Sequence, residues 1–334
     1  MMFVGHALFA FALAVLFAER RGWSARQALA LGIVTGSFAA LPDVDVVYAL
    51  FALDGGRFVS GGAGDPEAFW AAANSGHRSM THSLVVAAVA APAFGLLIAL
   101  VRRSARRPLL VSAGALSGLG GLVAVAIAVS GPLGGIVMGA FVLAGVGLAA
   151  LTARRTDLSP RTVAAAAAIG LFSHPWGDLV TGSPPQMLYP FEVGLFDARV
   201  LLHPDPTIHL LGAFALELAV IWLAALAVVR VTDRSIRLFS DRSAALGAAY
   251  GAAAIVLVPP TLDVSYHFVF SILAVGSVCG VLSWYRSVSP VRTVVRRDVA
   301  AAERLRPNFG VVAIALAGTT VALVGYAVVY VALA

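Results

Sequence analysis

The sequence predicts an all-α membrane protein, a polytopic bundle of transmembrane helices, on three observations. Of the 334 residues, 60% are hydrophobic and only 12% are charged, whereas a soluble domain is typically about half apolar and about a quarter charged. Apolar runs long enough to cross a bilayer recur along the whole chain. Arginines gather in the short segments between these runs, as they do in the cytoplasmic loops of membrane proteins. A soluble globular fold is therefore excluded.

The apolar runs give the expected number of spans. A helix needs about 20 apolar residues to cross roughly 30 Å of hydrocarbon, with about 17 as the lower limit. Some runs meet this length outright, one is slightly short, and two reach it only with their polar ends. The spans expected, roughly ten, are 3–18, 28–45, 83–101, 109–129, 132–152, 162–180, 208–229, 243–260, 266–285 and 309–333. The first is read as a retained span, because its arginines follow the apolar run instead of preceding it.

The arginine clusters set the expected orientation. With ten spans they all fall on one side, which the positive-inside rule makes cytoplasmic; they lie at 20–26, 102–107, 154–161, 230–242 and 286–306. Both termini are then expected outside, in the cytoplasmic membrane. The net charge of +6 follows from this topology, so a nucleic-acid partner is not expected.

Seven ionisable residues stand at the ends of four expected spans. Such residues are costly in a membrane and need a reason; they are His6, Asp43, Asp45, His77, His82, His174 and Asp178. The topology rests only on apolar length and arginine position, yet it places all seven at one face, the outer one. Imidazole and carboxylate groups are ligands that zinc, manganese and iron accept. We therefore expect one shared metal site near the outer membrane face.

Two spacings constrain how these side chains point. His174 and Asp178 are four residues apart, so a helix places them on one face, where they can share an ion. Asp43 and Asp45 follow Pro42, and carboxylates two residues apart point the same way only in an extended segment or a turn. More than four ligands in one place indicate either two metal ions or one ion with outer carboxylates. Zinc is the favoured ion.

A third spacing predicts a turn. His77 and His82 are five residues apart, and a regular helix would splay them by more than a quarter turn. We therefore expect a turn between them, with Thr81 or Ser83 capping the helix that follows. Each of these patterns also has a plainer explanation when taken alone: an interfacial histidine, a helix stop at Pro42, or a solvated helix end. Their occurrence together favours the metal site.

The expected chemistry is hydrolysis. A metal-bound water has a pKa near neutrality, and the ion also polarises a phosphoryl or acyl oxygen. Arg78 lies between the two histidines of GHRSMTHS, where its guanidinium is placed to hold a phosphate through two hydrogen bonds. Asp45 or Asp178 is the expected general base. Arg78, Asp45 and Asp178 are thus the catalytic candidates, and a phosphoester is the expected substrate, with membrane phospholipid as one option.

At these residues the sequence resembles the YdjM-like family of inner-membrane-associated metal-dependent hydrolases. The family carries an N-terminal His and PDxD, HxxxTHS and SHxxxD elements, which correspond here to His6, the Pro42 to Asp45 segment, His77 to Ser83, and Ser173 to Asp178. The resemblance covers about the first 190 residues. The family is distantly similar to zinc-dependent phospholipase C and P1-type nucleases, which implies that the motif residues are metal ligands and that the substrate is a phosphoester. We accordingly expect a metal-site region over 1–207 and additional helices over 208–334.

Two other functions remain open from the sequence. A divalent-cation transporter would need a polar path through the membrane, and apart from Glu217 the middle of the spans is apolar. A purely structural metal would have all its positions closed by protein ligands, which sequence cannot test. Three further histidines, His203, His209 and His267, lie in or near outer loops and are expected to be solvated or interfacial.

Overall fold

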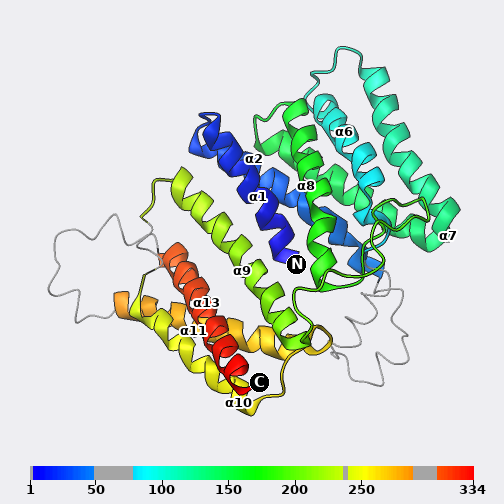
Figure 1. Cartoon of the computed structure of the whole chain (residues 1–334). Helices are drawn as coiled ribbons and strands as arrows, with labels where there is room; N and C mark the ends of the chain where they lie inside the picture. Colours follow the sequence, from blue (N-terminus) through cyan, green and yellow to red (C-terminus); the bar gives the residue numbers. More distant parts are fainter. Residues whose placement is uncertain (1–2, 49–77, 236–239, 289–306) are drawn as a thin grey trace, which may run out of the picture. The chain divides into compact units, whose positions relative to one another are not determined.

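The computed structural model describes residues 3–48, 78–235, 240–288 and 307–334, and these residues form helices and no strands. The all-α class is therefore confirmed for this part of the chain (Figure 1). Contacts divide the chain into two compact units, residues 1–200 and 201–334. The first unit carries all of the candidate site residues that the structure describes.

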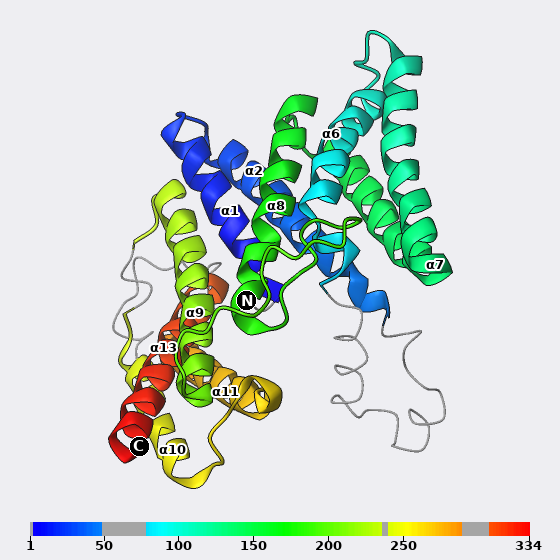
Figure 2. The same cartoon turned by 45° about the vertical axis from the view of Figure 1, so that its right-hand side comes forward.

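In its described residues, the first unit consists of the helices α1, α2, α6, α7 and α8 and the short 3-10 segments η1 and η2. Their bounds are α1 Phe3–Arg20, α2 Ala25–Ala40, η1 Leu41–Tyr48, η2 Met80–His82, α6 Leu84–Val101, α7 Pro108–Arg155 and α8 Pro160–Thr181. Helix α8 packs against α1, α2 and α6, and Figure 2 shows it between α2 and α6. This central position places the end of α8 next to the ends of its neighbours.

Local sequence signals set where these helices begin. Ser24 caps α2 and forms a capping box with Gln27, the reciprocal arrangement that satisfies two otherwise unpaired amides. Ser83 caps α6 by accepting hydrogen bonds from the amides of Val85 and Val86, as the sequence predicted. The expected turn before it is also present, as the 3-10 turn η2. Ser83, which directly follows the candidate ligand His82, thus fixes the start of α6 at the edge of the candidate site.

Glycines allow the helices around the site to approach closely. A Cβ added to Gly170 in α8 would lie 2.6 Å from the Thr35 carbonyl oxygen and 2.7 Å from the Ala39 amide nitrogen of α2. A Cβ added to Gly36 in α2 would lie 2.7 Å from the Ala7 carbonyl oxygen of α1. Small residues permit such backbone contact between helices in membranes. The three helices therefore meet at short distances set by their sequences.

Helix α7 consists of two helical pieces that reverse direction at Gly131. Gly131 has φ 70, a left-handed conformation that glycine adopts readily, and Pro132 follows it. A Cβ added to Gly135 would lie 2.4 Å from Ile127 Cγ1, although a straight helix would separate these residues by about 12 Å. Figure 1 shows the two pieces side by side. The expected spans 109–129 and 132–152 lie on either side of this reversal.

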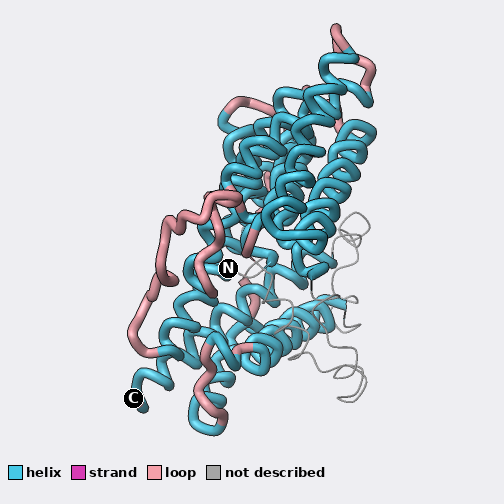
Figure 3. Tube along the Cα trace, turned by 90° about the vertical axis from the view of Figure 1, so that its right-hand side faces the viewer, coloured by secondary structure: helices cyan, strands magenta, loops and turns pink. Residues whose placement is uncertain are grey.

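The second unit has its own core. Its elements are α9 Pro206–Val231, η4 Arg242–Ala252, α10 Ala253–Val256, η5 Leu262–Val264, α11 Tyr266–Val288 and α13 Pro307–Leu333, drawn as helices and loops in Figure 3. Asp205 caps α9, and the hydrogen bond from the Ile208 amide lowers the pKa of that carboxyl. The Leu202 amide donates to His209 Nδ1. Residues 201–205 thus belong with α9 in the second unit. The sequence predicts the end of the metal-site region at residue 207 instead.

Six segments of the described chain are long and apolar enough to cross a membrane: Ala25–Val47, Leu84–Val101, Pro108–Arg155, Pro206–Val231, Tyr266–Arg286 and Phe309–Leu333. The expectation of roughly ten spans is not supported, nor is the placement of both termini outside that depended on it. The expected spans 3–18, 162–180 and 243–260 are absent from the six. Residues 243–260 form mainly the 3-10 segment η4 and the short α10, and α8 carries the polar SHPWGD segment at its end.

Candidate metal centre

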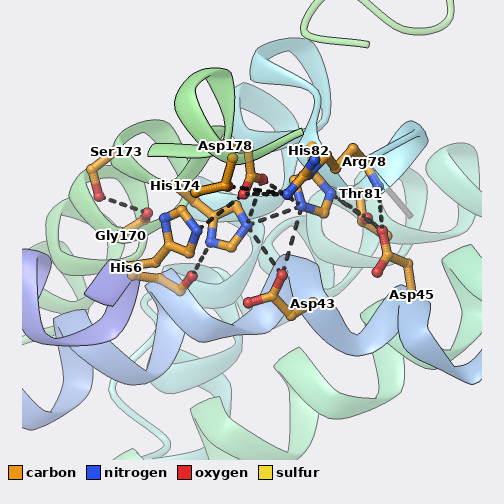
Figure 4. A network of polar contacts seen from close by, with 12 residues as sticks. His6, Asp43, Asp45, Arg78, Thr81, His82, Gly170, Ser173, His174 and Asp178 are labelled. Carbon is orange, nitrogen blue, oxygen red and sulfur yellow. Dashed lines mark hydrogen bonds and ion pairs between the residues drawn. The ribbon is translucent and has the colours of Figure 1, made fainter. Parts of the chain in front are cut away.

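Four elements that are distant in sequence bring five predicted ligands into contact. His6 comes from α1, Asp43 from η1, His82 from η2, and His174 and Asp178 from α8 (Figure 4). All five side chains are buried, with exposed fractions of 3% or less. The groups His6, His174, Asp178 and Asp43, His82, His174 each offer three ligand atoms within 4.8 Å of one another. The expected convergence of these residues is confirmed.

Four ligand atoms within this cluster lie close together. The Nε2 atoms of His82 and His174 lie 3.0 Å apart. Asp43 Oδ1 lies 3.7 and 3.4 Å from these two nitrogens, and Asp178 Oδ2 lies 3.3 and 3.7 Å from them. Ligand atoms on a zinc ion are about 3.3–3.6 Å apart, because each lies about 2.0–2.2 Å from the metal. Each carboxylate oxygen is therefore placed to share a zinc-sized cation with the two nitrogens.

The hydrogen bonds of the two histidines leave their Nε2 atoms facing each other. His174 Nδ1–H donates to the Ala39 carbonyl oxygen at 2.6 Å, so a neutral His174 has its lone pair on Nε2. His82 Nδ1 lies 3.3 Å from Asp45 Oδ2 and 3.1 Å from Thr81 Oγ1, so its own proton is also held on Nδ1. Two neutral rings would then oppose lone pairs at 3.0 Å, which either a proton or a metal ion between them relieves. The donor set consequently fits a divalent metal.

Asp45 orients His82 and is not one of the four ligand residues Asp43, His82, His174 and Asp178. Its Oδ2 accepts hydrogen bonds from the Thr81 hydroxyl at 3.0 Å and the Arg78 amide at 3.1 Å, and it also faces His82 Nδ1. Arg78 adopts φ 68, a left-handed conformation that costs a non-glycine residue about 1–2 kcal/mol. In this conformation the Arg78 amide donates to Asp45 Oδ2. A carboxylate behind a histidine ligand fixes the tautomer and orientation of the ring. Asp45 has this geometry.

The second oxygen of Asp178 connects the cluster to two more residues. His6 Nε2 lies 3.2 Å from Asp178 Oδ1, and Arg78 Nη2 lies 3.5 Å from the same oxygen. Arg78 Nη2 also donates to Thr181 Oγ1 at 3.3 Å, and its side chain keeps 17% exposure. A Cβ on Gly182 would overlap the Arg78 guanidinium. Glycine at 182 therefore gives this cation its place beside the cluster.

The electrostatics of the cluster favour a cation. Burial lowers the pKa of His82, but hydrogen bonds to Asp178, Asp43 and Asp45 outweigh this effect and hold the pKa well above its usual value of 6.5. Asp178 Oδ2 is buried and lies 3.3 Å from His82 Nε2 and 3.7 Å from His174 Nε2. The three carboxylates around the two imidazoles thus stabilise positive charge. A bound metal would take the place of the proton on His82.

Among the described ligands, His174 can bind one metal ion. The two ligand groups share His174, whose Nδ1 is bonded to Ala39, which leaves only Nε2 for a metal. One imidazole nitrogen binds one ion, so the two groups cannot both be filled through this residue. A second ion would need His6, Asp178 Oδ1 and ligands from elsewhere. His77, the remaining predicted ligand, lies outside the described residues, and its role stays a prediction.

Three supporting contacts were not predicted from the sequence. They are the Ala39 carbonyl that orients His174, the Thr181 hydroxyl that receives a hydrogen bond from Arg78, and the close approach of Gly182 to the guanidinium. A backbone carbonyl has no sequence signature, and the other two depend on how the end of α8 meets η2. Thr81 was expected only as a candidate cap, whereas its hydroxyl donates to Asp45.

Comparison with known families supports the first part of this assignment. The family model described as YdjM inner membrane protein matches residues 1–130. This region includes His6, Asp43, Asp45 and His82 and ends before α8, so the match is shorter than the resemblance expected from the motifs. It carries no evidence of similarity to phospholipase C or of hydrolase activity. No curated protein and no solved structure matches the chain.

Proposed function

We propose that the protein, whose first 130 residues match the YdjM inner membrane protein family, is a membrane-embedded hydrolase that uses a divalent metal to cleave phosphoesters. The observation that carries the proposal is the convergence of buried ligand atoms from Asp43 and Asp178 on the Nε2 atoms of His82 and His174, at distances of 3.3 to 3.7 Å. Zinc is the favoured ion because nitrogen and oxygen ligands at this spacing suit it. Manganese and iron accept the same donors.

The side chains around the set have separate roles in this proposal. A divalent ion held there supplies an activated water and a polarised phosphoryl oxygen. Arg78, partly exposed and 3.5 Å from Asp178, binds the phosphate through its planar guanidinium. Asp45 already accepts hydrogen bonds from Thr81 and the Arg78 amide, so we assign it to positioning His82. Asp178, which faces Arg78, is then the better candidate to accept a proton.

The helices themselves support a non-cytoplasmic site. In α1, His6 is near the start and Arg20 is at the end. In α8, Arg161 is near the start, while His174 and Asp178 are near the end. Helix α6 begins directly after His82 and ends before Arg102. The ligands and the arginines thus occupy opposite ends of these helices. For α6, which is among the six candidate spans, the positive-inside rule assigns the arginine end to the cytoplasm.

A structural metal is the second candidate, and one observation favours it. Ligand atoms from four residues gather around the two histidine nitrogens, and closed four-ligand sites are typical of structural zinc. A transport function has less support. Within the described residues of the first unit, every buried ionisable side chain belongs to this cluster, so no chain of further charged groups leads from it across the membrane.

Activity of the purified protein separates these readings. The protein in detergent, loaded with zinc, is assayed with bis(p-nitrophenyl) phosphate and with a phospholipid, beside Arg78→Gln and His174→Ala variants. A hydrolase turns over at least one substrate, loses turnover with metal in His174→Ala, and loses turnover but keeps metal in Arg78→Gln. Bound metal without turnover in the wild type would contradict the hydrolase and favour the structural role.

A further inference from the structure

A loop beside the candidate metal centre exposes large apolar side chains. Residues 191–200, called the apolar loop below, follow α8 and are exposed at every position. They include Phe191, Val193, Leu195, Phe196 and Val200, of which the first two are more than half exposed. Loops that face water are normally polar, and exposed apolar patches mark interaction surfaces. The exposed side chains of this loop therefore suit an apolar surrounding better than water.

The apolar loop is fixed to the site at both of its ends. Just before it, Ser83 donates to the Tyr189 carbonyl at 2.7 Å, next to the ligand His82. At its far end, the Val200 amide donates to the Leu179 carbonyl at 2.7 Å, next to the ligand Asp178. Figure 2 draws the loop that follows α8 in green. Whatever covers this loop therefore lies beside the metal ligands.

The backbone of the loop determines how deep it can lie. Among the described residues, its amides form backbone hydrogen bonds only at the ends, from Phe191 to Leu188 and from Val200 to Leu179. Lipid-exposed irregular backbone does not occur within the hydrocarbon region, because its polar groups would have no partners there. Apolar side chains on such a backbone suit the headgroup boundary, where water is available to the amides.

The loop also continues an apolar face of α8. Ile169, Phe172 and Trp176 are exposed on this helix, and their spacing places them along one side. Trp176 is followed in space by Phe196, with ring centroids 6.3 Å apart in an edge-to-face arrangement. Aromatic residues at such positions are typical of the membrane interface. The exposed apolar side of the helix thus continues into the loop through the contact of Trp176 with Phe196.

We propose that residues 191–200 insert into the headgroup region of the bilayer that the helices span, beside the metal centre. The inference about the substrate rests on the proposed function. If the loop lies in the headgroup region, the substrate is a phosphoester of a membrane lipid, which reaches Arg78 and the metal ligands from the interface. The loop carries Glu192, Asp197 and Arg199, so it has no excess of positive charge, and insertion depends on apolar contact instead of attraction to anionic lipid.

Fluorescence quenching in nanodiscs of phosphatidylethanolamine and phosphatidylglycerol tests the position of the loop. Val193→Cys in a Cys279→Ala background is labelled with bimane, since Cys279 is the single native cysteine. Nitroxides on the lipid headgroup are expected to quench this label more strongly than nitroxides near the end of the acyl chain. Quenching by aqueous iodide alone, or protection from all three quenchers, would overturn the proposal.

Two matched labels calibrate the depth. Leu116→Cys lies on the exposed side of α7 and is expected to respond to the acyl-chain nitroxide. Ser104→Cys lies in the loop between α6 and α7 and is expected to respond to iodide. If the label at 193 behaved like the label at 104, the loop would face water.

Turnover tests the substrate class. A Val193→Ser, Leu195→Ser double variant is expected to hydrolyse phospholipid in nanodiscs several-fold more slowly relative to bis(p-nitrophenyl) phosphate, with metal content unchanged. Equal rates for this variant and the wild type on phospholipid would overturn the lipid substrate. If the wild type hydrolysed neither substrate, the proposed function would fail, while the quenching result would still decide where the loop lies.

Discussion

The Nε2 atoms of His82 and His174 face each other across 3.0 Å, although the residues are 92 positions apart in sequence. Each ring is held by its Nδ1, His174 by the Ala39 carbonyl and His82 by Asp45 and Thr81. With each Nδ1 occupied, positive charge between the two Nε2 atoms relieves their lone-pair repulsion, either as a proton on His82, whose pKa is raised, or as a metal ion. The predictions below follow from it.

Removing a ligand and removing its outer partner should have different effects on zinc. His174→Ala deletes a ligand atom and is expected to abolish stoichiometric binding. Asp45→Asn keeps His82 but weakens its orientation, so zinc affinity should fall by about 10–100-fold. Competition with a fluorescent zinc chelator measures both affinities. His203→Ala, at a histidine in the second unit, is the control, and equal loss in all three variants would contradict the assignment.

Arg78 should affect turnover more than metal binding. Arg78→Lys keeps the charge but loses the planar pair of donors, so we expect a higher KM for a phosphodiester with little change in zinc content. Gly182→Val should reproduce this phenotype, because its side chain would displace the guanidinium. Steady-state kinetics with parallel metal analysis test both variants. Unchanged kinetics in both would remove the phosphate-binding role of Arg78.

The close contact of α8 with α2 should be intolerant of a single methyl group. In Gly170→Ala, the new Cβ meets the backbone of Thr35 and Ala39 at 2.6 and 2.7 Å, and such overpacking typically costs about 1–3 kcal/mol. The same shift would separate Asp43 from His174. Thermal unfolding in detergent should show a lower Tm, accompanied by weaker zinc binding.

A matched alanine substitution provides the control for this effect. A Cβ added to Gly139 in α7 would have no neighbour within 4 Å, so Gly139→Ala should leave Tm unchanged or raise it, because alanine favours helix by about 0.5–1 kcal/mol. A loss of stability at 139 equal to that at 170 would show that the helix contact is not the cause.

Metal should stabilise the folded protein through mass action. A ligand that binds only the native state at about 100 times its Kd adds about 2.7 kcal/mol. We expect zinc to raise the Tm of the wild type and EDTA to reverse the shift, with no response in a His82→Ala, His174→Ala double variant. A zinc-dependent shift that persisted in the double variant would place the stabilising site elsewhere.

The all-α class and the candidate ligands were accessible from the sequence because both depend on local chemistry. Long apolar runs specify helices in a membrane, and His6, His82 and Asp178 are conspicuous because charged groups are rare there. Ser83 was recognisable as a cap because it directly precedes an apolar helix. What these signals share is that a few neighbouring residues determine each of them.

The details that the sequence did not supply depend on tertiary packing. Residues 243–260 are apolar enough to suggest a span, yet they fold mainly as the 3-10 segment η4 packed on α13. Asp43 and Asp45 have the same chemistry, and only the position of η2 makes one a candidate ligand and the other a partner of His82. The number of ions likewise depends on the Ala39 carbonyl, which occupies His174 Nδ1.

X-ray absorption at the zinc edge of the purified, zinc-loaded protein tests the central claim most directly. The account predicts one tightly bound zinc per chain with two imidazole nitrogens and carboxylate oxygens, all at about 2.0–2.2 Å. Substitution of both His82 and His174 should remove the imidazole scattering together with the metal. A protein that retains no stoichiometric zinc, or one whose zinc has no imidazole ligand, would contradict the account.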